Sequence, residues 1–176
     1  MKAYDVACLG NFTKDTIVSA SGTRVVDGGA FNYGTQVAAR MGLRVAAITR
    51  LARQDFRVVD ELERLGVDVF ARATPQSTCL RLEYPSSNVD KRVIHVTSTA
   101  GAFTPADLQG VEARAFVVAA SLRGEVSLGV IEKLAAKETI LAADVQGFVR
   151  VLRNGMMAYE PWPEQEPVLA HVDVLK

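Results

Sequence analysis

A carboxylate and a pair of glycines near the N-terminus are the residues whose types and spacing best suit ligand chemistry. Asp15 follows a short apolar run over residues 4–9, and Gly28-Gly29 stands just before a stretch with helical spacing. A carboxylate accepts two hydrogen bonds from hydroxyl groups, which suits recognition of a polyol. Paired glycines let a ligand approach the backbone, and the amides of a helix start favour oxygen-rich ligands. The alternatives are a solvated turn at Asp15 and an ordinary tight turn at the glycines.

Other polar residues follow apolar runs and are weaker candidates. Asn11 could assist Asp15, although Asn is also a common turn residue. Asp144, Gln146 and Arg150 follow the apolar run at 140–143. An arginine at such a place can bind a phosphate or a carboxylate, and a structural salt bridge explains it equally well.

The cysteines and histidines do not predict a metal site. Cys8 and Cys79 each lie in an apolar stretch, which is typical of buried thiols. His95 and His171 are far apart and lack the spacing of metal ligands. We therefore expect all four side chains to be structural.

The elements that must position these residues alternate between two periodicities. Continuous apolar runs, typical of buried parallel strands, lie at 4–9, 45–51, 67–70, 115–120, 140–143 and 172–175. Helical spacing recurs at 32–41, 56–65 and 125–136, and Asp55 is placed to cap the second of these helices. The pattern predicts one α/β domain over residues 1–176, with a Rossmann-like, mainly parallel sheet and flanking helices.

Two segments depart from this pattern and predict a small β appendage. Residues 17–21 and 24–26 form short strand-like runs around a Ser-Gly-Thr turn. Residues 78–84 alternate between apolar and polar side chains and can pair with 92–97 across a polar turn. A two-faced hairpin of this kind covers another part of the molecule rather than joining a central parallel sheet.

Composition excludes several classes of function. Lys plus Arg and Asp plus Glu both number 20, so the formal net charge is zero, and no basic stripe indicates nucleic-acid or membrane-surface binding. The N-terminal segment MKAYDVACLG is not a secretory signal, and no run approaches the ~20 apolar residues that cross a bilayer. We expect a cytoplasmic protein that binds a small molecule, with no nucleic-acid or membrane partner.

Three ordered stretches carry a resemblance to a known family. They are Gly10 to Asp15, Gly28 to Tyr33 with the helix end at 39–42, and Asp55-Phe56 followed by residues 61–68. In this order and spacing they resemble the PfkB, or ribokinase-type, carbohydrate kinases. Residues 143–150 are similar to an Asp-x-Gln-Gly-x-x-Arg stretch in one branch of that family. Residues 171–176 resemble the strand before its Asn-x-x-Glu motif.

The resemblance implies a sugar site and a lid. In such kinases the residue at Asp15 binds the sugar, and the corresponding set here is Asn11, Asp15, Gly28, Gly29, Asn32 and Tyr33. Segments at about 13–27 and 77–98 match the β lid of the family, which excludes water during transfer. Lids of this type pair between subunits, which implies a homodimer. Phe31 and Tyr84 could form an apolar wall against the sugar, or they could be ordinary packing.

Two positions depart from the family pattern. An Asn that usually contacts the sugar is replaced by Tyr33, and the nearest Asn is Asn32. The usual Gly of a Gly-x-Asp step is Arg53 or Ala52, depending on register. These departures favour a sugar or nucleoside other than ribose.

The donor half of the family pattern is not found in these residues. A full-length relative uses ATP and Mg²⁺, and a Gly-Ala-Gly-Asp segment supplies its catalytic base. No Gly-x-Gly-Asp occurs in the 176 residues, so that base is expected beyond Lys176. The resemblance therefore implies an incomplete ribokinase-like domain that is inactive alone, and whether this chain is itself an enzyme stays open. The alternatives are a non-catalytic sugar-binding or dimerisation module, and an unrelated α/β domain without the Gly-x-Gly-x-x-Gly turn.

Overall fold

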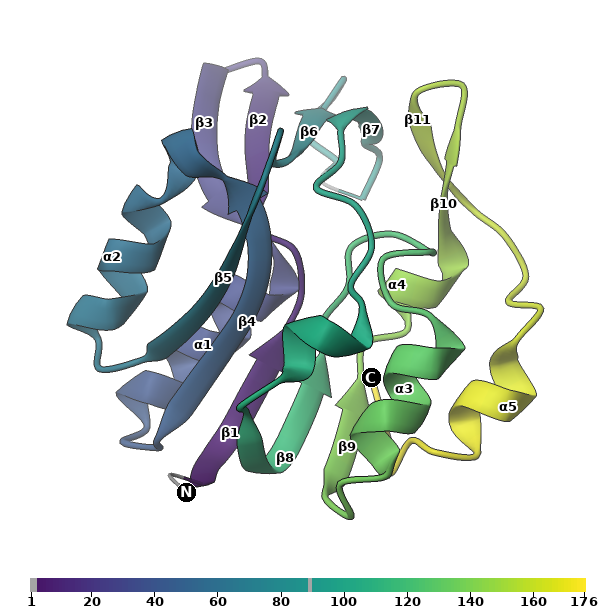
Figure 1. The fold of residues 1–176 in the computed structure, drawn as a ribbon. Helices are drawn as coiled ribbons and strands as arrows, with labels where there is room; N and C mark the ends of the chain where they lie inside the picture. The colour runs from purple at the N-terminus through teal and green to yellow at the C-terminus, as the bar shows by residue number, and fades with distance from the viewer. Residues whose placement is uncertain (1–2, 89) are drawn as a thin grey trace.

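A computed structural model describes residues 3–88 and 90–176 and contains two six-stranded sheets (Figure 1). The first sheet is parallel throughout. In spatial order its strands are β12 (Val174–Leu175), β9 (Ile140–Ala143), β8 (Glu112–Val118), β1 (Ala3–Leu9), β4 (Val45–Ala52) and β5 (Asp68–Thr74). Each strand overlaps one of the continuous apolar runs, so the predicted α/β fold class is confirmed.

Helices cover both faces of the parallel sheet (Figure 1). They are α1 (Ala30–Arg40), α2 (Arg57–Arg64), α3 (Leu128–Ala135), α4 (Gln146–Val149) and α5 (Gln165–Leu169), with short 3-10 helices η1 (Arg53–Asp55) and η2 (Pro105–Leu108). α1 and α2 share one buried apolar cluster, and α3 and α5 share another. Among the described residues, no helix combines the length and the apolar character needed to cross a bilayer.

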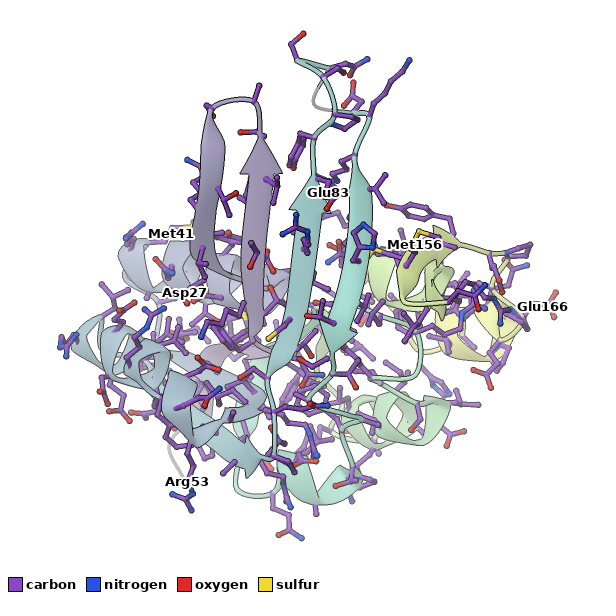
Figure 2. All side chains as sticks on the ribbon, turned by 90° about the horizontal axis from the view of Figure 1, so that it is seen from above. Asp27, Met41, Arg53, Glu83, Met156 and Glu166 are labelled. Carbon is purple, nitrogen blue, oxygen red and sulfur yellow. The ribbon has the colours of Figure 1, made fainter. Side chains whose placement is uncertain are left out.

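The second sheet mixes antiparallel and parallel pairs, and we call it the mixed sheet. In spatial order its strands are β10 (Arg150–Arg153), β11 (Met156–Tyr159), β7 (Val93–Ser98), β6 (Thr78–Glu83), β2 (Thr13–Ser19) and β3 (Gly22–Gly28). Figure 2 shows β3, β2, β6 and β7 side by side. The predicted β6–β7 hairpin is present, with Leu82 opposite Ile94. β2 and β3 are longer than expected because the pairing runs from Thr13 opposite Gly28 to Ser19 opposite Gly22.

The hairpin β10–β11 is a feature that the sequence analysis did not predict. Its turn is Asn154-Gly155, with φ of 50° and 79° at the two residues. Two consecutive positive φ angles match the type I′ turn, for which Asn-Gly is a preferred sequence. β11 joins the mixed sheet where Met156 lies opposite His95.

The two faces of the mixed sheet differ in polarity. Leu80, Ile94 and Val96 are buried on the face turned toward the rest of the molecule, where they form a cluster with Leu122. The neighbouring residues on β6 and β7 point the other way and are mostly polar, with Val93 exposed among them. Among these, Arg81 Nε donates to Glu83 Oε1 at 2.7 Å, and His95 Nε2 lies 3.6 Å from Glu83 Oε2.

Candidate functional site

The chain leaves the carboxyl edge of the parallel sheet at Gly10 and enters the mixed sheet at Thr13. A Cβ on Gly10 would lie 2.5 Å from the backbone oxygen of Ala119, so only glycine lets β1 and β8 end this close together. Asp15 therefore lies within β2, which excludes the alternative of a solvated turn. The longer β2–β3 pairing is the physical reason.

Asp15 and Gly28 are in direct contact. A Cβ built on Gly28 would lie 2.3 Å from Asp15 Oδ2 and 2.5 Å from Thr13 Oγ1. The missing side chain of Gly28 thus provides the space that the Asp15 carboxylate occupies.

Gly29 brings the start of α1 to the same place. It is the N-cap residue of α1, with φ of 97°, and a Cβ there would lie 2.8 Å from the backbone oxygen of Asn11. That φ and that contact both require glycine. Asn11 is fixed in turn by a hydrogen bond of 2.9 Å from its Nδ2 to Gly101 O.

Four buried oxygens at this site have no hydrogen-bond partner among the described residues. They are Asn11 Oδ1, Thr13 Oγ1, Asp15 Oδ1 and Glu125 Oε1, and we call them the oxygen row. Asn11, Thr13 and Glu125 are 0%, 1% and 4% exposed. Buried polar atoms are nearly always satisfied, so such a group indicates a place for water or a polar ligand. Residues 11, 13 and 15 alternate along an extended chain, which directs them to one side.

Two members of the oxygen row, Thr13 and Glu125, escaped the sequence analysis. The alternate spacing of 11, 13 and 15 is a signal that could have identified Thr13 once the strand was known. Glu125 was expected to lie inside a helix from 125 to 136. The helix α3 begins instead at Leu128, and Glu125 Oε2 accepts a hydrogen bond of 2.6 Å from the Ser121 amide.

Burial shifts the pKa of both carboxyl groups in the row upward. For Asp15 burial is the main cause; the Thr13 hydroxyl and the Arg92 guanidinium oppose it, and Asp27 adds to it. Burial also raises the pKa of Glu125, although the side chain of Asn11 and two backbone amides favour its charged form. Buried carboxyl groups with a shifted pKa are typical of functional sites.

The two remaining predicted contacts on α1 lie in different directions. Tyr33 is 55% exposed, its hydroxyl donates to Asp27 O at 3.3 Å, and its pKa is raised by burial and then by Asp15 and Asp27. It therefore lies beside the site. Asn32 is buried, accepts a hydrogen bond of 3.1 Å from Gln36 Nε2, and lines a small cavity between α1 and α2. The Asn32 side chain is thus hydrogen-bonded within α1 and faces the cavity beside α2.

Asp55 links the mixed sheet to the body of the molecule and does not cap α2 as expected. The N-cap residue of α2 is Phe56, without a side-chain cap. Asp55 Oδ1 lies 3.0 Å from Lys14 Nζ, and Asp55 Oδ2 accepts a hydrogen bond of 2.6 Å from Ser77 Oγ. Burial alone would raise the pKa of Asp55, but these two partners hold it below its ordinary value.

The residues after β9 stabilise the carboxyl edge of the parallel sheet. Asp144 Oδ1 accepts a hydrogen bond of 3.0 Å from the Gln146 amide, and Gln146 Nε2 donates to Ala120 O at 3.4 Å. Arg150 lies in β10, where its Nε donates to Tyr159 Oη at 3.3 Å. Arg150 is therefore part of the β10–β11 hairpin rather than of the carboxyl edge of the parallel sheet.

Two of the remaining candidates, Phe31 and Cys8, are buried in the core. Phe31 is fully buried in the core that α1 and α2 share, so it packs there rather than against a ligand. Cys8 is buried, and burial raises the pKa of its thiol. In the described part of the chain, no three His, Cys, Asp or Glu side chains gather as metal ligands would.

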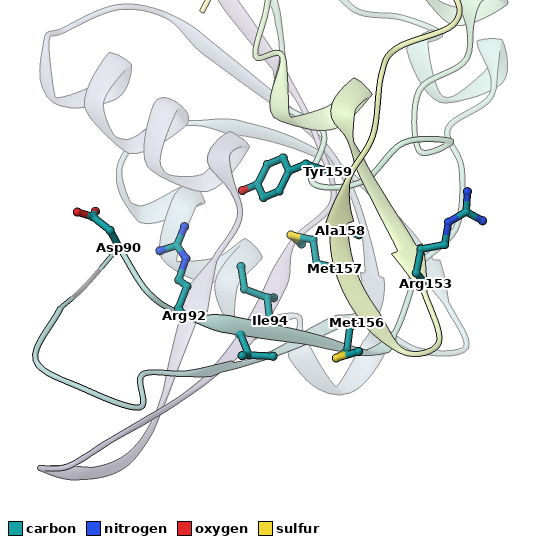
Figure 3. Close-up of a pocket in the computed structure, with 9 residues that line it drawn as sticks. Asp90, Arg92, Ile94, Arg153, Met156, Met157, Ala158 and Tyr159 are labelled. Carbon is teal, nitrogen blue, oxygen red and sulfur yellow. The ribbon is translucent and has the colours of Figure 1, made fainter.

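Two large cavities are lined by residues outside the oxygen row. One, of about 430 Å³, lies between β7 and the β10–β11 hairpin (Figure 3). The other, of about 520 Å³, is lined by one side of α1 and by β8, β9 and β12. The second cavity is largely apolar and includes Val37, Val117, Ala142 and Val174.

Comparison with known proteins finds similarity among solved structures. No family model and no curated protein matches the chain. A sulfate complex of a pyrophosphate-dependent kinase in the ribokinase family is 29% identical, with a TM-score of 0.90 over 97% of this chain and 60% of that one. A pyrophosphate-dependent kinase in the same family, complexed with a pyrophosphate analog and myo-inositol, is 28% identical, with a TM-score of 0.88 and the same coverage.

A more distant similarity concerns the fold alone. Ribokinase from Arabidopsis thaliana, complexed with ribose and ATP, is 14% identical, with a TM-score of 0.69 over 99% of this chain and 60% of that one. This chain thus spans about 60% of the length of all three kinases.

Proposed function

We propose that this chain, which has the fold of the ribokinase-family sugar kinases, holds the polyol that such a kinase phosphorylates. The observation that carries the proposal is the oxygen row, with the Asp15 carboxylate seated on Gly28. Hydroxyl groups are hydrogen-bond donors, and donors are what these four oxygens lack.

Three residues of the row have distinct parts in binding. The Asp15 carboxylate accepts hydrogen bonds from two neighbouring hydroxyls of the polyol, and charge-assisted bonds of this kind are the stronger ones. Asn11 Oδ1 and Thr13 Oγ1 accept from hydroxyls farther along the ring. The start of α1 at Gly29 offers backbone amides to the polyol oxygens.

The acceptor that the chain favours is a polyol other than ribose. A related kinase was solved with myo-inositol, and Arabidopsis ribokinase with ribose. Tyr33, beside Asp15, replaces the Asn expected of a ribose site. A cyclitol such as myo-inositol is therefore our first candidate, and a hexose or nucleoside is the alternative.

The donor is ATP with Mg²⁺, as the sequence suggested, or pyrophosphate, as in two of the similar kinases. The described residues contain no cluster suited to a metal ion, and the sequence has no Gly-x-Gly-Asp segment. These residues do not form a donor site, so we derive no transfer step from them. We place the protein in the cytoplasm.

Titration calorimetry of the 176-residue polypeptide tests the binding proposal. We expect myo-inositol to bind, and we expect no release of ADP or orthophosphate when ATP or pyrophosphate is added with Mg²⁺. Absence of binding to myo-inositol, ribose and glucose alike would contradict the proposal. Turnover at ordinary kinase rates would show instead that the polypeptide contains a complete active site.

A non-catalytic polyol-binding module is the second candidate. The lack of any Gly-x-Gly-Asp segment favours it. A homodimer through the mixed sheet also belongs among our proposals. Since the outer face of β6 and β7 carries Arg81, Glu83 and His95, a partner there would meet polar side chains rather than an apolar surface.

A further inference from the structure

The cavity between β7 and the β10–β11 hairpin is lined by one acidic and two basic side chains, Asp90, Arg92 and Arg153, and by apolar side chains (Figure 3). Its volume is about 430 Å³, enough for a substituted sugar. Ile94 and Met157 supply apolar surface on the face turned toward the rest of the molecule, and Met156, the preceding residue on the strand, lies at the edge of the cavity. Methionine side chains adapt to irregular shapes, which suits contact with a carbon skeleton.

Arg92 is the cation that faces this cavity and is not paired with a carboxylate. Its Nη1 donates to Tyr84 Oη at 3.2 Å, and within the described ranges it forms no ion pair. Asp90 also lines the cavity but does not lie within ion-pair distance of Arg92. Burial raises the pKa of Asp15, and the positive charge of Arg92 opposes that rise, so the two side chains lie close enough to interact.

The β10–β11 hairpin carries a second guanidinium without a carboxylate partner among the described residues, that of Arg150, near this cavity. Tyr159 lines the cavity, and the Arg150 guanidinium carbon lies 5.7 Å from the centre of its ring. Arg150 also has no carboxylate partner in the part of the chain that the structure describes. Arg153 differs, because its Nη2 donates to Glu160 Oε2 at 2.8 Å.

From this arrangement we propose that the cavity binds an anionic group, a carboxylate or a phosphate, at the end of the polyol remote from Asp15. A guanidinium presents paired N–H donors that match such a group, and a free guanidinium in a cavity lacks that partner. The substrate class is then an acidic polyol, such as a uronic acid or a sugar phosphate. The inference rests on the proposed function, because it assumes that hydroxyls occupy the oxygen row.

A comparison of one neutral and one acidic sugar tests the inference. We would measure the dissociation constants of glucose and glucuronate by titration calorimetry, with myo-inositol as a neutral reference and sodium acetate as a simple anion. Three proteins would be compared: the unaltered chain, Arg92→Gln and Arg153→Gln. The two substitutions remove the same charge from the same cavity, but Arg153 is already paired with Glu160.

The expected result is a ratio of affinities. Glucuronate should bind about tenfold more tightly than glucose to the unaltered chain and to Arg153→Gln, and this preference should disappear in Arg92→Gln. Arg92→Lys should restore part of it. Circular dichroism would establish that each variant is folded.

Three outcomes would overturn the inference. The first is equal affinity for glucose and glucuronate in the unaltered chain. The second is an equal loss of affinity for glucose and glucuronate in Arg92→Gln, which would indicate a structural role for Arg92. The third is acetate binding as tightly as glucuronate. If myo-inositol or glucose binds while glucuronate shows no preference, the proposed function stands and this inference fails. If no sugar binds, both fail together.

Discussion

Asp15 is a carboxylate in a place where burial disfavours its charged form. The molecule nevertheless keeps one of its oxygens without a hydrogen-bond partner among the described residues. Substitution of Asp15 should therefore weaken polyol binding but raise the stability of the fold. The two properties should change in opposite directions at this residue.

Asp15→Asn should weaken myo-inositol binding by about ten- to a hundredfold, because hydrogen bonds to charged groups contribute about 1.5–3 kcal/mol. Calorimetric titration measures the change. The matched control is Asp27→Asn on the adjacent strand β3, where the carboxylate lies 2.6 Å from Nη2 of Arg57 on α2. Equal weakening by both substitutions would contradict the role of Asp15.

The same Asp15→Asn variant should unfold at a higher temperature than the unaltered chain at neutral pH. The pKa of Asp15 is raised in the folded state, so its charged form opposes folding as pH rises above the ordinary carboxyl range. The stability difference should shrink at acidic pH, where Asp15 is protonated in both states. Thermal unfolding followed from about pH 3, below the ordinary Asp pKa of about 4, to about pH 8 measures this. A lower unfolding temperature at neutral pH would contradict it.

Gly28→Ala should abolish polyol binding while the protein stays folded. The new methyl carbon would lie 2.3 Å from Asp15 Oδ2, so the carboxylate must move. Gly129→Ala is the control, since its nearest atom would lie 3.9 Å away and alanine favours the helix α3. Retained binding in Gly28→Ala, measured by calorimetry, would show that the contact has no part in the site.

At the level of elements, Asp55 fastens the mixed sheet to η1 and α2. It joins Lys14 on β2 and Ser77, which precedes β6, and Ser77 Oγ accepts a hydrogen bond of 2.9 Å from the Ala52 amide at the end of β4. Since the pKa of Asp55 is lowered by folding, its contribution is present above its unfolded pKa, about 4, and is lost as pH falls through the folded value.

Asp55→Asn should lower the free energy of unfolding by about 1–3 kcal/mol at neutral pH, because the buried partners lose a charged acceptor. Urea titration measures the change. Below about pH 4 the difference from the unaltered chain should decrease. The exposed Glu63→Gln on α2 is the control and should change little. A constant difference at all pH values would contradict the assignment.

The sequence predicted the parallel sheet because its strands are continuous apolar runs, and a buried strand has few other interpretations. The β10–β11 hairpin was missed although Asn154-Gly155 is a strong turn signal, because its flanking residues do not alternate cleanly in polarity. A solvated turn stayed an open alternative for Asp15 because the length of β2 depends on pairing with β3 and β6. Glu125 could not be found, since its position depends on a hydrogen bond to Ser121 that no periodicity reports.

At the scale of the whole molecule, one face of the parallel sheet is only partly covered. α1 and α2 lie over β1, β4 and β5, and the cavity beside α1 exposes the same face of β8, β9 and β12. Val37 and Val174, on its two walls, are 57% and 54% exposed. Parallel sheets are normally covered on both faces. In the isolated polypeptide this cavity is therefore the apolar surface most available for contact.

The 176-residue polypeptide should self-associate through this surface as its concentration rises. Val37→Glu should reduce the association at least severalfold, because it places a charge in the apolar cavity. Sedimentation velocity measures the distribution of species. Val25→Glu on β3, where Val25 is 55% exposed, is the matched comparison. Greater loss of association in Val25→Glu would favour pairing through the mixed sheet instead.

Asp15 lies on β2 of the mixed sheet and not on the parallel sheet. Its strand pairs with β3 and β6 and makes no ladder with the parallel sheet. If the mixed sheet moved away from the parallel sheet, the carboxylate that we propose to bind the polyol would move with it. Opening of the site and release of the polyol would then be coupled.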